Sequence, residues 1–258
     1  MELDTDLGRT LEPFLPPITQ KSTSAKDTNS VDATSDVNLP FITLTWAQSL
    51  DGRIAAGSGT RTRISGPETK VMTHYQRSRH DAILVGANTA VTDDPKLNCR
   101  YPETGVNMIR PVIVDPSARW TYSSSTARKV LLEKQGIAPF VLIRMDTKIP
   151  TEEEDLLNGD GGQFIRLDFP KDPRENWLQI FQKLCSLGIQ SVMVEGGAFV
   201  IESLLTTNLP DSVVVTIGSV FLGKEGVSVS PKAVQTLKDV VWWRGQEDAV
   251  MASRLTSK

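Results

Sequence analysis

The run from residue 81 to residue 100, DAILVGANTAVTDDPKLNCR, constrains the fold of this chain more than any other. It opens with residues 82–85, an apolar run of the length and β-branched character of a buried strand. Gly86 follows, where the main chain can approach a ligand closely, and residues 87–91 can form one or two helical turns. Residues 93–95, Asp-Asp-Pro, then break the chain sharply, because proline lacks an N–H donor and restricts the preceding residue. Such units build ligand sites at the carboxyl ends of strands in α/β sheets, although an ordinary strand–helix connection has the same pattern.

Strand-like and helix-like runs alternate along the rest of the chain, which predicts an α/β fold with a mostly parallel sheet. We expect an antiparallel hairpin from residues 240–243 and 249–254 at its end. Ser65 and Glu68 have the spacing of a capping box for a helix that follows them. The expected strands are 40–48, 82–85, 111–115, 140–144, 163–168, 191–195 and 211–220, and the expected helices are 67–79, 87–91, 126–134, 172–187 and 198–206.

A second glycine-containing junction follows the apolar run 191–195, where Gly196 and Gly197 precede a helix-like segment. Without side chains, the main-chain amides of such a turn can reach a pyrophosphate, and the helix dipole favours negative charge there. The pattern is not the Gly-x-Gly-x-x-Gly fingerprint of a dinucleotide-binding Rossmann domain. Taken alone, the glycine pair is more often a tight turn than a phosphate site.

Composition narrows the function classes. The chain has 258 residues, 39% of them hydrophobic, which is enough for one sizeable core. A formal net charge of -3 with both signs interspersed gives no indication of a nucleic-acid or membrane surface. The N-terminal residues lack the pattern of a secretory signal, and two distant cysteines favour reduced thiols in the cytoplasm. Two histidines are too few for a multi-histidine metal centre, and we expect no metal.

Two regions of different character divide the chain. Residues 1–38 read as an N-terminal extension, in which 10–17 are expected to pack in an extended form on the body. Residues 19–38 are rich in Ser, Thr, Asp, Asn and Lys, which predicts a flexible tail. Residues 39–258 are expected to form a single domain.

Three motifs in order carry a resemblance to a known family. They are Ser-Leu-Asp-Gly-Arg-Ile-Ala at residues 49–55, Gly-Ala-x-Thr-x-x-x-Asp-Asp-Pro at 86–95 with Leu97 and Arg100, and Val-Glu-Gly-Gly at 194–197. Together they resemble the stand-alone, fungal or archaeal type of 2,5-diamino-6-ribosylamino-4(3H)-pyrimidinone 5′-phosphate reductase of riboflavin biosynthesis. Those enzymes are homologous to the reductase domain of the bacterial bifunctional deaminase–reductases. The resemblance implies a dihydrofolate-reductase-like three-layer fold, with helices on both faces of the sheet, and a homodimer.

The resemblance also implies roles for individual residues. NADPH would be the cofactor, a phosphorylated pyrimidine the substrate, and a hydride would reduce the ribosylamino group to ribitylamino. Asp51 and Glu195 are the candidate proton donors, with water an equal alternative. The implied substrate contacts are Ser49, Arg77, Leu97, Arg100 and Glu195, of which the two arginines would bind the phosphate. The implied cofactor contacts are Thr89, Asp93, Gly196, Gly197, Ala198, Phe199, Val200 and Ile201.

Two departures from the bacterial pattern bear on the substrate. The His-x-Glu and Pro-Cys-x-x-Cys elements of a zinc deaminase are absent, and the segment before residue 39 is too short for that domain. A stand-alone enzyme that acts before deamination is therefore expected. Arg63 stands where bacterial relatives carry a tryptophan. Two alternatives remain open: a dihydrofolate-reductase-like enzyme for another pterin or pyrimidine, and a non-catalytic nucleotide-binding protein.

Overall fold

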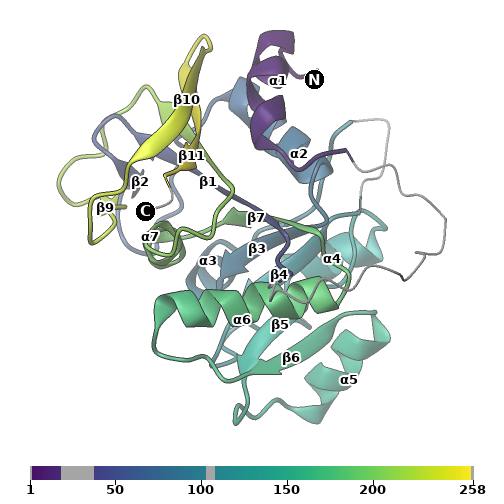
Figure 1. Ribbon diagram of the computed structural model, residues 1–258. Coiled ribbons are helices and arrows are strands. Elements are labelled where there is room, and N and C mark those ends of the chain that lie inside the picture. The colour runs from purple at the N-terminus through teal and green to yellow at the C-terminus, as the bar shows by residue number, and fades with distance from the viewer. Residues whose placement is uncertain (1, 19–37, 103–107, 257–258) are drawn as a thin grey trace, which may run out of the picture.

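The computed structural model in Figure 1 describes residues 2–18, 38–102 and 108–256, and its centre is a nine-stranded sheet. The strands lie in the order β10-β11-β8-β1-β7-β3-β4-β5-β6. All neighbours from β8 to β6 pair in parallel, whereas β11 is antiparallel to both β8 and β10. The bounds are β1 Phe41–Ser49, β3 Ala82–Gly86, β4 Arg110–Val114, β5 Phe140–Arg144, β6 Gln163–Leu167, β7 Ser191–Glu195, β8 Ser212–Gly218, β10 Leu237–Arg244 and β11 Asp248–Leu255. A separate pair joins β2 Arg53–Ala55 to β9 Val227–Ser228.

Strand β7 lies between β1 and β3, although it follows both by more than a hundred residues of sequence. One carboxylate fixes the start of this pairing. Oδ2 of Asp81 accepts hydrogen bonds from the main-chain N–H groups of Gln190 (2.9 Å) and Ser191 (3.1 Å) and from the Ser191 hydroxyl (3.1 Å). Because β7 returns to a place between two earlier strands, the order of strands in the sheet reverses there. Open α/β sheets bind ligands at the carboxyl ends of the strands beside such a reversal.

Helices cover both faces of the sheet, as Figure 1 shows. On one face α6 (Pro173–Ser186) and α7 (Ala198–Leu205) bury their apolar sides, including Phe181 and Leu204. The other face carries α3 (Ala87–Asp93), α4 (Thr126–Leu132) and α5 (Thr151–Gly159) over a second cluster. This is the expected three-layer α/β arrangement. Helix α5 was not expected, because its acidic first turn reads as solvated surface and only Leu157 is buried.

The N-terminal segment is helical, so the expected extended form of residues 10–17 is wrong. Helix α1 spans Thr5–Leu11 and a 3₁₀ turn follows at Glu12–Phe14. Asp4 accepts a hydrogen bond from the Leu7 amide at 2.9 Å and so caps α1. The buried side chains pack against Met72 of α2 and Trp243 of β10, and they are Leu7, Leu11, Phe14 and Leu15. The tail expected over residues 19–38 lies almost entirely outside the described residues.

Helix α2 (Pro67–Ser78) begins differently from the capping box that Ser65 and Glu68 predict. Its N-cap is Gly66, and no side chain within the segment caps it. Asp248 at the start of β11 accepts hydrogen bonds from the Gly66 amide (2.7 Å) and from the Thr69 hydroxyl. Glu68 accepts from the Gln246 amide at 2.9 Å. A residue 182 positions away in sequence thus caps α2, which no local pattern could indicate.

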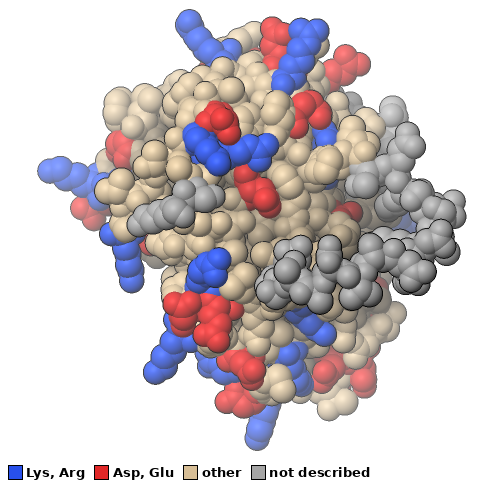
Figure 2. All heavy atoms as spheres, in the orientation of Figure 1, with Lys and Arg blue, Asp and Glu red and all other residues tan. Residues whose placement is uncertain are grey.

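In Figure 2, basic and acidic side chains are interspersed on the face in view, with no large patch of one sign. Among the described residues, no helix is both long enough and apolar enough to cross a membrane.

The packing of α1 predicts that Leu11→Ala lowers the free energy of unfolding by about 2–5 kcal/mol, since Leu11 is fully buried and its loss leaves a cavity. Urea denaturation followed by circular dichroism measures the change. Leu132→Ala is the control, because 61% of Leu132 is exposed and about 0.5 kcal/mol or less is expected. Equal stability of the two variants would contradict the docking of α1 on the body.

Candidate functional site

The carboxyl ends of β1, β7 and β3 meet at one edge of the sheet. They bring together Ser49, Glu195 and Gly86, which end the three strands. The register pairs Thr45 with Glu195 across β1 and β7, so the last four residues of β1 extend beyond β7. All three predicted motifs therefore converge on one region.

The two glycine-containing turns at this edge touch each other. Gly86 precedes α3 and Gly197 precedes α7. A Cβ atom on Gly86 would lie 2.9 Å from Cγ2 of Val200, and one on Gly197 would lie 3.2 Å from Oγ1 of Thr89. A Cβ on Gly196 would approach Cβ of Val200 to 2.6 Å. The close approach of the two turns requires glycine, and it leaves an open main-chain cradle beside Thr89.

The predicted cofactor contacts in α7 divide into two kinds. The amides of Val200 and Ile201 already donate to the Gly197 carbonyl at 3.0 and 3.2 Å, and both side chains are buried. The amides of Ala198 and Phe199 have no acceptor among the described residues, as expected for the first turn of a helix. The Phe199 side chain is 77% exposed beside them. Ala198 and Phe199 are therefore the amides free to bind a phosphate.

Asp51 forms a clamp between its own loop and the loop at residues 222–223. It accepts hydrogen bonds from the Ser49 hydroxyl (2.5 Å) and from the amides of Leu222 (3.0 Å) and Gly223 (2.8 Å). The Ser49 hydrogen bond, followed by that from Leu222, lowers the pKa of Asp51 to about 2. Ser49 itself is fully buried and also accepts from the Arg53 amide at 2.9 Å. This geometry favours a structural role for both residues over proton donation or direct substrate contact.

Glu195 is held by Arg77 in a bidentate ion pair. Nε and Nη2 of Arg77 donate to the two oxygens of Glu195 at 2.9 and 2.7 Å, and both side chains are largely buried. Nη1 of Arg77 donates to the Asn98 carbonyl at 2.9 Å. Each nitrogen of the Arg77 guanidinium thus has an acceptor before any ligand arrives. Both Glu195 oxygens are acceptors in this pair, which favours a carboxylate that accepts from a substrate over one that supplies a proton.

A cleft of about 1260 Å³ opens between α2 and the segment that follows α3. Five cationic side chains and two carboxylates line it, which are Arg61, Lys70, Arg77, Lys96, Arg100, Asp93 and Asp94. Asp94 already accepts from the amide (2.9 Å) and the hydroxyl (2.6 Å) of Thr126. Since Arg77 is paired with Glu195, the other four cations outnumber the two carboxylates and give the cleft a net positive charge. Such a cleft suits a small anionic ligand.

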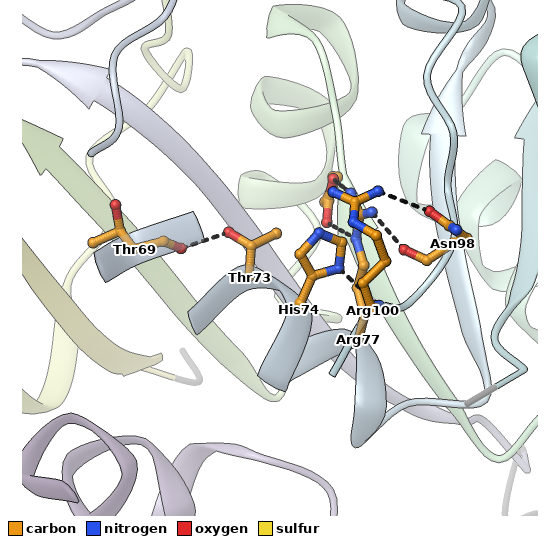
Figure 3. A network of polar contacts seen from close by, with 7 residues as sticks. Thr69, Thr73, His74, Arg77, Asn98 and Arg100 are labelled. Atoms are coloured by element: carbon orange, nitrogen blue, oxygen red, sulfur yellow. Dashed lines mark hydrogen bonds and ion pairs between the residues drawn. The ribbon is translucent and has the colours of Figure 1, made fainter. Parts of the chain in front are cut away.

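Arg100 lines this cleft beside His74 of α2, as Figure 3 shows. Its Nη1 donates to the Asn98 side-chain oxygen at 3.1 Å, and its remaining N–H groups are free among the described residues. Burial and the charge of Arg77 lower the pKa of Arg100. Leu97, by contrast, is 2% exposed and belongs to the second core cluster. Leu97 lines the cleft, but little of its side chain is exposed for the predicted substrate contact.

Two residues with no role predicted from the sequence organise this cleft. Asn98 is buried and binds both arginines, Arg100 with its side chain and Arg77 with its carbonyl, while its amide group donates to the Gln135 carbonyl at 3.1 Å. His74 lies on the α2 face that carries Arg77 and accepts from the Arg100 amide. The spacing of residues 70, 74 and 77 on one helix face was the available signal for His74. Asn98 had no local signal.

The two cysteines and the metal-ligating side chains add no further candidate to the site. Cys99 and Cys185 are buried free thiols, and burial raises the pKa of Cys99. No group of three or more metal-ligating side chains is found within the described residues.

Comparison with known proteins identifies the family. The model of the RibD C-terminal domain family matches residues 40–251, most of this chain. The chain belongs to the RibD C-terminal domain family. This membership confirms the resemblance drawn from the three motifs, and the chain is an oxidoreductase.

Members of the family that resemble this chain include fungal enzymes. The 2,5-diamino-6-ribosylamino-4(3H)-pyrimidinone 5′-phosphate reductase of Debaryomyces hansenii is 49% identical over 224 residues, which are 85% of this chain and 91% of that protein. The enzyme of the same name from Saccharomyces cerevisiae is 41% identical over 86% and 89% of the two chains.

Solved structures give the same picture. The riboflavin biosynthesis reductase of S. cerevisiae has a TM-score of 0.76 at 35% identity, over 97% of this chain and 100% of that chain. The RibD protein of Acinetobacter baumannii shares the fold, with a TM-score of 0.66 at 22% identity over 85% and 59% of the two chains. The expected dihydrofolate-reductase-like α/β fold class is thereby confirmed.

The clamp at Asp51 predicts a pH-dependent loss of stability in Asp51→Asn. Because the pKa of Asp51 is lowered from 3.8 to about 2 on folding, the carboxylate stabilises the folded state above pH 3.8. This stabilisation is lost as the pH falls from 3.8 through about 2. The stability difference between wild type and Asp51→Asn should therefore be constant from pH 7 to pH 5 and should narrow below pH 4, as urea titrations at several pH values would measure. Asp155→Asn, at an exposed site, is the control, and a difference that does not vary with pH would contradict the clamp.

Proposed function

We propose that this chain is the NADPH-dependent reductase that converts 2,5-diamino-6-ribosylamino-4(3H)-pyrimidinone 5′-phosphate to its ribitylamino product in riboflavin biosynthesis. The observation that carries the proposal is the convergence of a glycine cradle, the Glu195–Arg77 pair and a cationic cleft at the ends of β1, β3 and β7. The names and coverage of the fungal relatives support the diamino compound as substrate. The cytoplasm fits a soluble substrate and cofactor of this kind.

The residues present fit a nicotinamide dinucleotide. The free amides of Ala198 and Phe199 at the start of α7 can donate to a pyrophosphate, and the absence of a side chain on Gly197 leaves their approach open. Thr89 borders the same cradle, and Asp93 at the end of α3 faces the cleft. When bound, NADPH supplies the hydride.

The chain's own residues would position the substrate. Arg100 presents free N–H groups to the phosphate, and Glu195 accepts hydrogen bonds from the hydroxyl or amino groups of the pyrimidine–ribose part. Arg77 holds Glu195 in the orientation this requires. Placing C1′ of the opened imine form within reach of the hydride is then the main contribution of the protein. Since both candidate carboxylates act as acceptors, water is the proton source in this scheme.

The alternative of a pterin reductase is less well supported. A pterin would require an acidic side chain on the first long helix of the domain, and the acidic residue of α2, Glu68, is bound to the Gln246 amide. The residues of α2 that line the cleft are Pro67, Lys70, Val71, Thr73, His74 and Arg77, none of them acidic.

The direct experiment follows the nicotinamide absorbance of the purified chain with NADPH or NADH and four substrates. These are the diamino pyrimidine phosphate, its deaminated counterpart, the unphosphorylated riboside and dihydrofolate. The proposal expects rapid oxidation of NADPH only with the diamino pyrimidine phosphate. Turnover of dihydrofolate alone, or none with any substrate under conditions that support the S. cerevisiae enzyme, would refute it.

The glycine cradle predicts that Gly197→Asp abolishes NADPH binding without unfolding the chain. The new carboxylate would stand where the pyrophosphate binds, and the nearest atom to its Cβ is a hydroxyl at 3.2 Å rather than main chain. Calorimetry with NADPH measures the affinity. Gly159→Asp is the matched control, because a Cβ there meets nothing within 4 Å. Unchanged NADPH affinity in folded Gly197→Asp would place the cofactor elsewhere.

The two arginines should give different kinetic losses. Arg100→Ala removes a charge-assisted contact of about 1.5–3 kcal/mol, so KM for the phosphorylated substrate should rise by about one to two powers of ten. Arg77→Ala should lower kcat as well, because Glu195 loses the partner that orients it, and Arg77→Lys should restore little. Steady-state kinetics with both substrates separates these effects. Wild-type kinetics in both variants would refute the phosphate site, and loss of NADPH affinity in both would assign the arginines to the cofactor.

The assembly is proposed to be a homodimer. On the edge strand β10, Val240 and Trp242 are 44% and 62% exposed, and apolar side chains on an unpaired edge are suited to pairing with a second chain. Light scattering at micromolar concentration should return twice the 28.3 kDa chain mass, and a monomer mass would exclude the dimer.

A further inference from the structure

One ring nitrogen of His74 accepts a hydrogen bond, and the other has no hydrogen-bond partner among the described residues. The Arg100 main-chain N–H points at Nδ1 of His74 over 3.2 Å, and a nitrogen that accepts a hydrogen bond carries no proton in the neutral ring. The proton of the neutral imidazole is therefore on Nε2. Nε2 has no hydrogen-bond partner among the described residues, although His74 lines the cleft. An oriented and unused donor in a ligand cleft needs an acceptor from outside the chain.

The charges around His74 keep this ring neutral. Burial, followed by the guanidinium groups of Arg77 and Arg100, lowers the pKa of His74 to about 3. The other titratable groups that line the cleft near it are Lys70 one turn earlier on α2 and the Cys99 thiol on the opposing segment. The ring thus adds a directional hydrogen-bond donor to the cleft without adding another positive charge, which would repel its neighbours.

We propose that His74 binds the phosphate of the substrate by donating its Nε2–H to a phosphate oxygen, beside Arg100. This inference rests on the proposed function and adds a binding residue to it. Figure 3 shows the His74 ring and the Arg100 side chain next to each other and close to Arg77. The main-chain N–H of Arg100 fixes the orientation of the His74 ring, which lies beside the Arg100 side chain. One residue therefore positions both donors, the Nε2–H of His74 and the guanidinium of Arg100. A phosphate dianion, with three acceptor oxygens, can use both donors at once.

Nuclear magnetic resonance tests this contact without any assay of activity. The chain has two histidines, so its ring nitrogens give a simple ¹⁵N-correlated spectrum. His80 is an internal control, since its Nδ1 contacts the Gln76 carbonyl at 2.7 Å and its Nε2 the Thr43 hydroxyl at 2.8 Å. The free chain should show His74 as the Nε2–H tautomer. Addition of ribose 5-phosphate should shift the Nε2–H signal of His74 and leave His80 unchanged, whereas ribose should shift neither.

The proposal is overturned by an Nδ1–H tautomer at His74, by no shift with ribose 5-phosphate, or by an equal shift with ribose. These outcomes are independent of the reductase activity. If the chain reduced none of the pyrimidines but His74 still responded to ribose 5-phosphate, the proposed function would fail and the phosphate contact would stand.

Two substitutions extend the test to catalysis. Glutamine can place an amide N–H where Nε2 lies, so His74→Gln should keep KM for the phosphorylated pyrimidine within about threefold of wild type. His74→Leu removes the donor and should raise that KM by about tenfold. Neither should change KM for NADPH, which a merely structural defect would raise. Equal KM values for His74→Leu and wild type would overturn the proposal, and if His74→Leu does not fold, the tautomer and titration of wild type decide it.

Discussion

The placement of β7 between β1 and β3 is the constraint on which the site depends. Parallel pairing in register brings the carboxyl ends of these strands to one edge, and Asp81 fixes where β7 begins. Glu195 and the glycine pair then follow automatically at that edge. A shift of one residue in the pairing of β7 would turn the Glu195 side chain to the opposite face of the sheet. Burial on both faces resists such a shift, since Val192 and Val194 pack in the cluster under α6 and α7, and Met193, on the opposite face of the strand, is fully buried.

Two arginines that line the cleft differ in how many of their N–H groups are already hydrogen-bonded. Each guanidinium nitrogen of Arg77 donates to an acceptor of the chain, and Arg77 works as a structural partner of Glu195. Arg100 keeps free N–H groups and is held from one side by Asn98. A sequence cannot distinguish these roles, because both residues are arginines predicted to bind the substrate phosphate. The distinction lies in which acceptors the fold brings within 3 Å.

Local patterns were sufficient for most of the fold. The hydrophobic runs located the strands of the main sheet, and Asp172 and Gly188 mark the ends of α6 as expected, with Asp172 accepting from the Glu175 amide and Gly188 at φ +86°. Apart from α5, whose acidic first turn hid a helix, the failures are long-range. The cap of α2 comes from Asp248, and α1 is stabilised by burial against Met72 and Trp243 rather than by its own propensity. The motifs identified the region of the site, but the roles of Asn98 and Asp51 depend on contacts that only the folded chain makes.

Helix α2, which forms one wall of the cleft, is anchored from both ends of the sequence. Asp248 holds its first turn, and on its outer side Glu12 contacts Tyr75 and pairs with Arg79 at 2.6 Å. During synthesis, therefore, the segment that carries Lys70, His74 and Arg77 leaves the ribosome long before the residue that caps it. The wall of the cleft can be completed only after residue 248 has emerged, so a ribosome-bound chain that stops short of β11 should be unable to retain ligand even with every ligand-contacting residue already made.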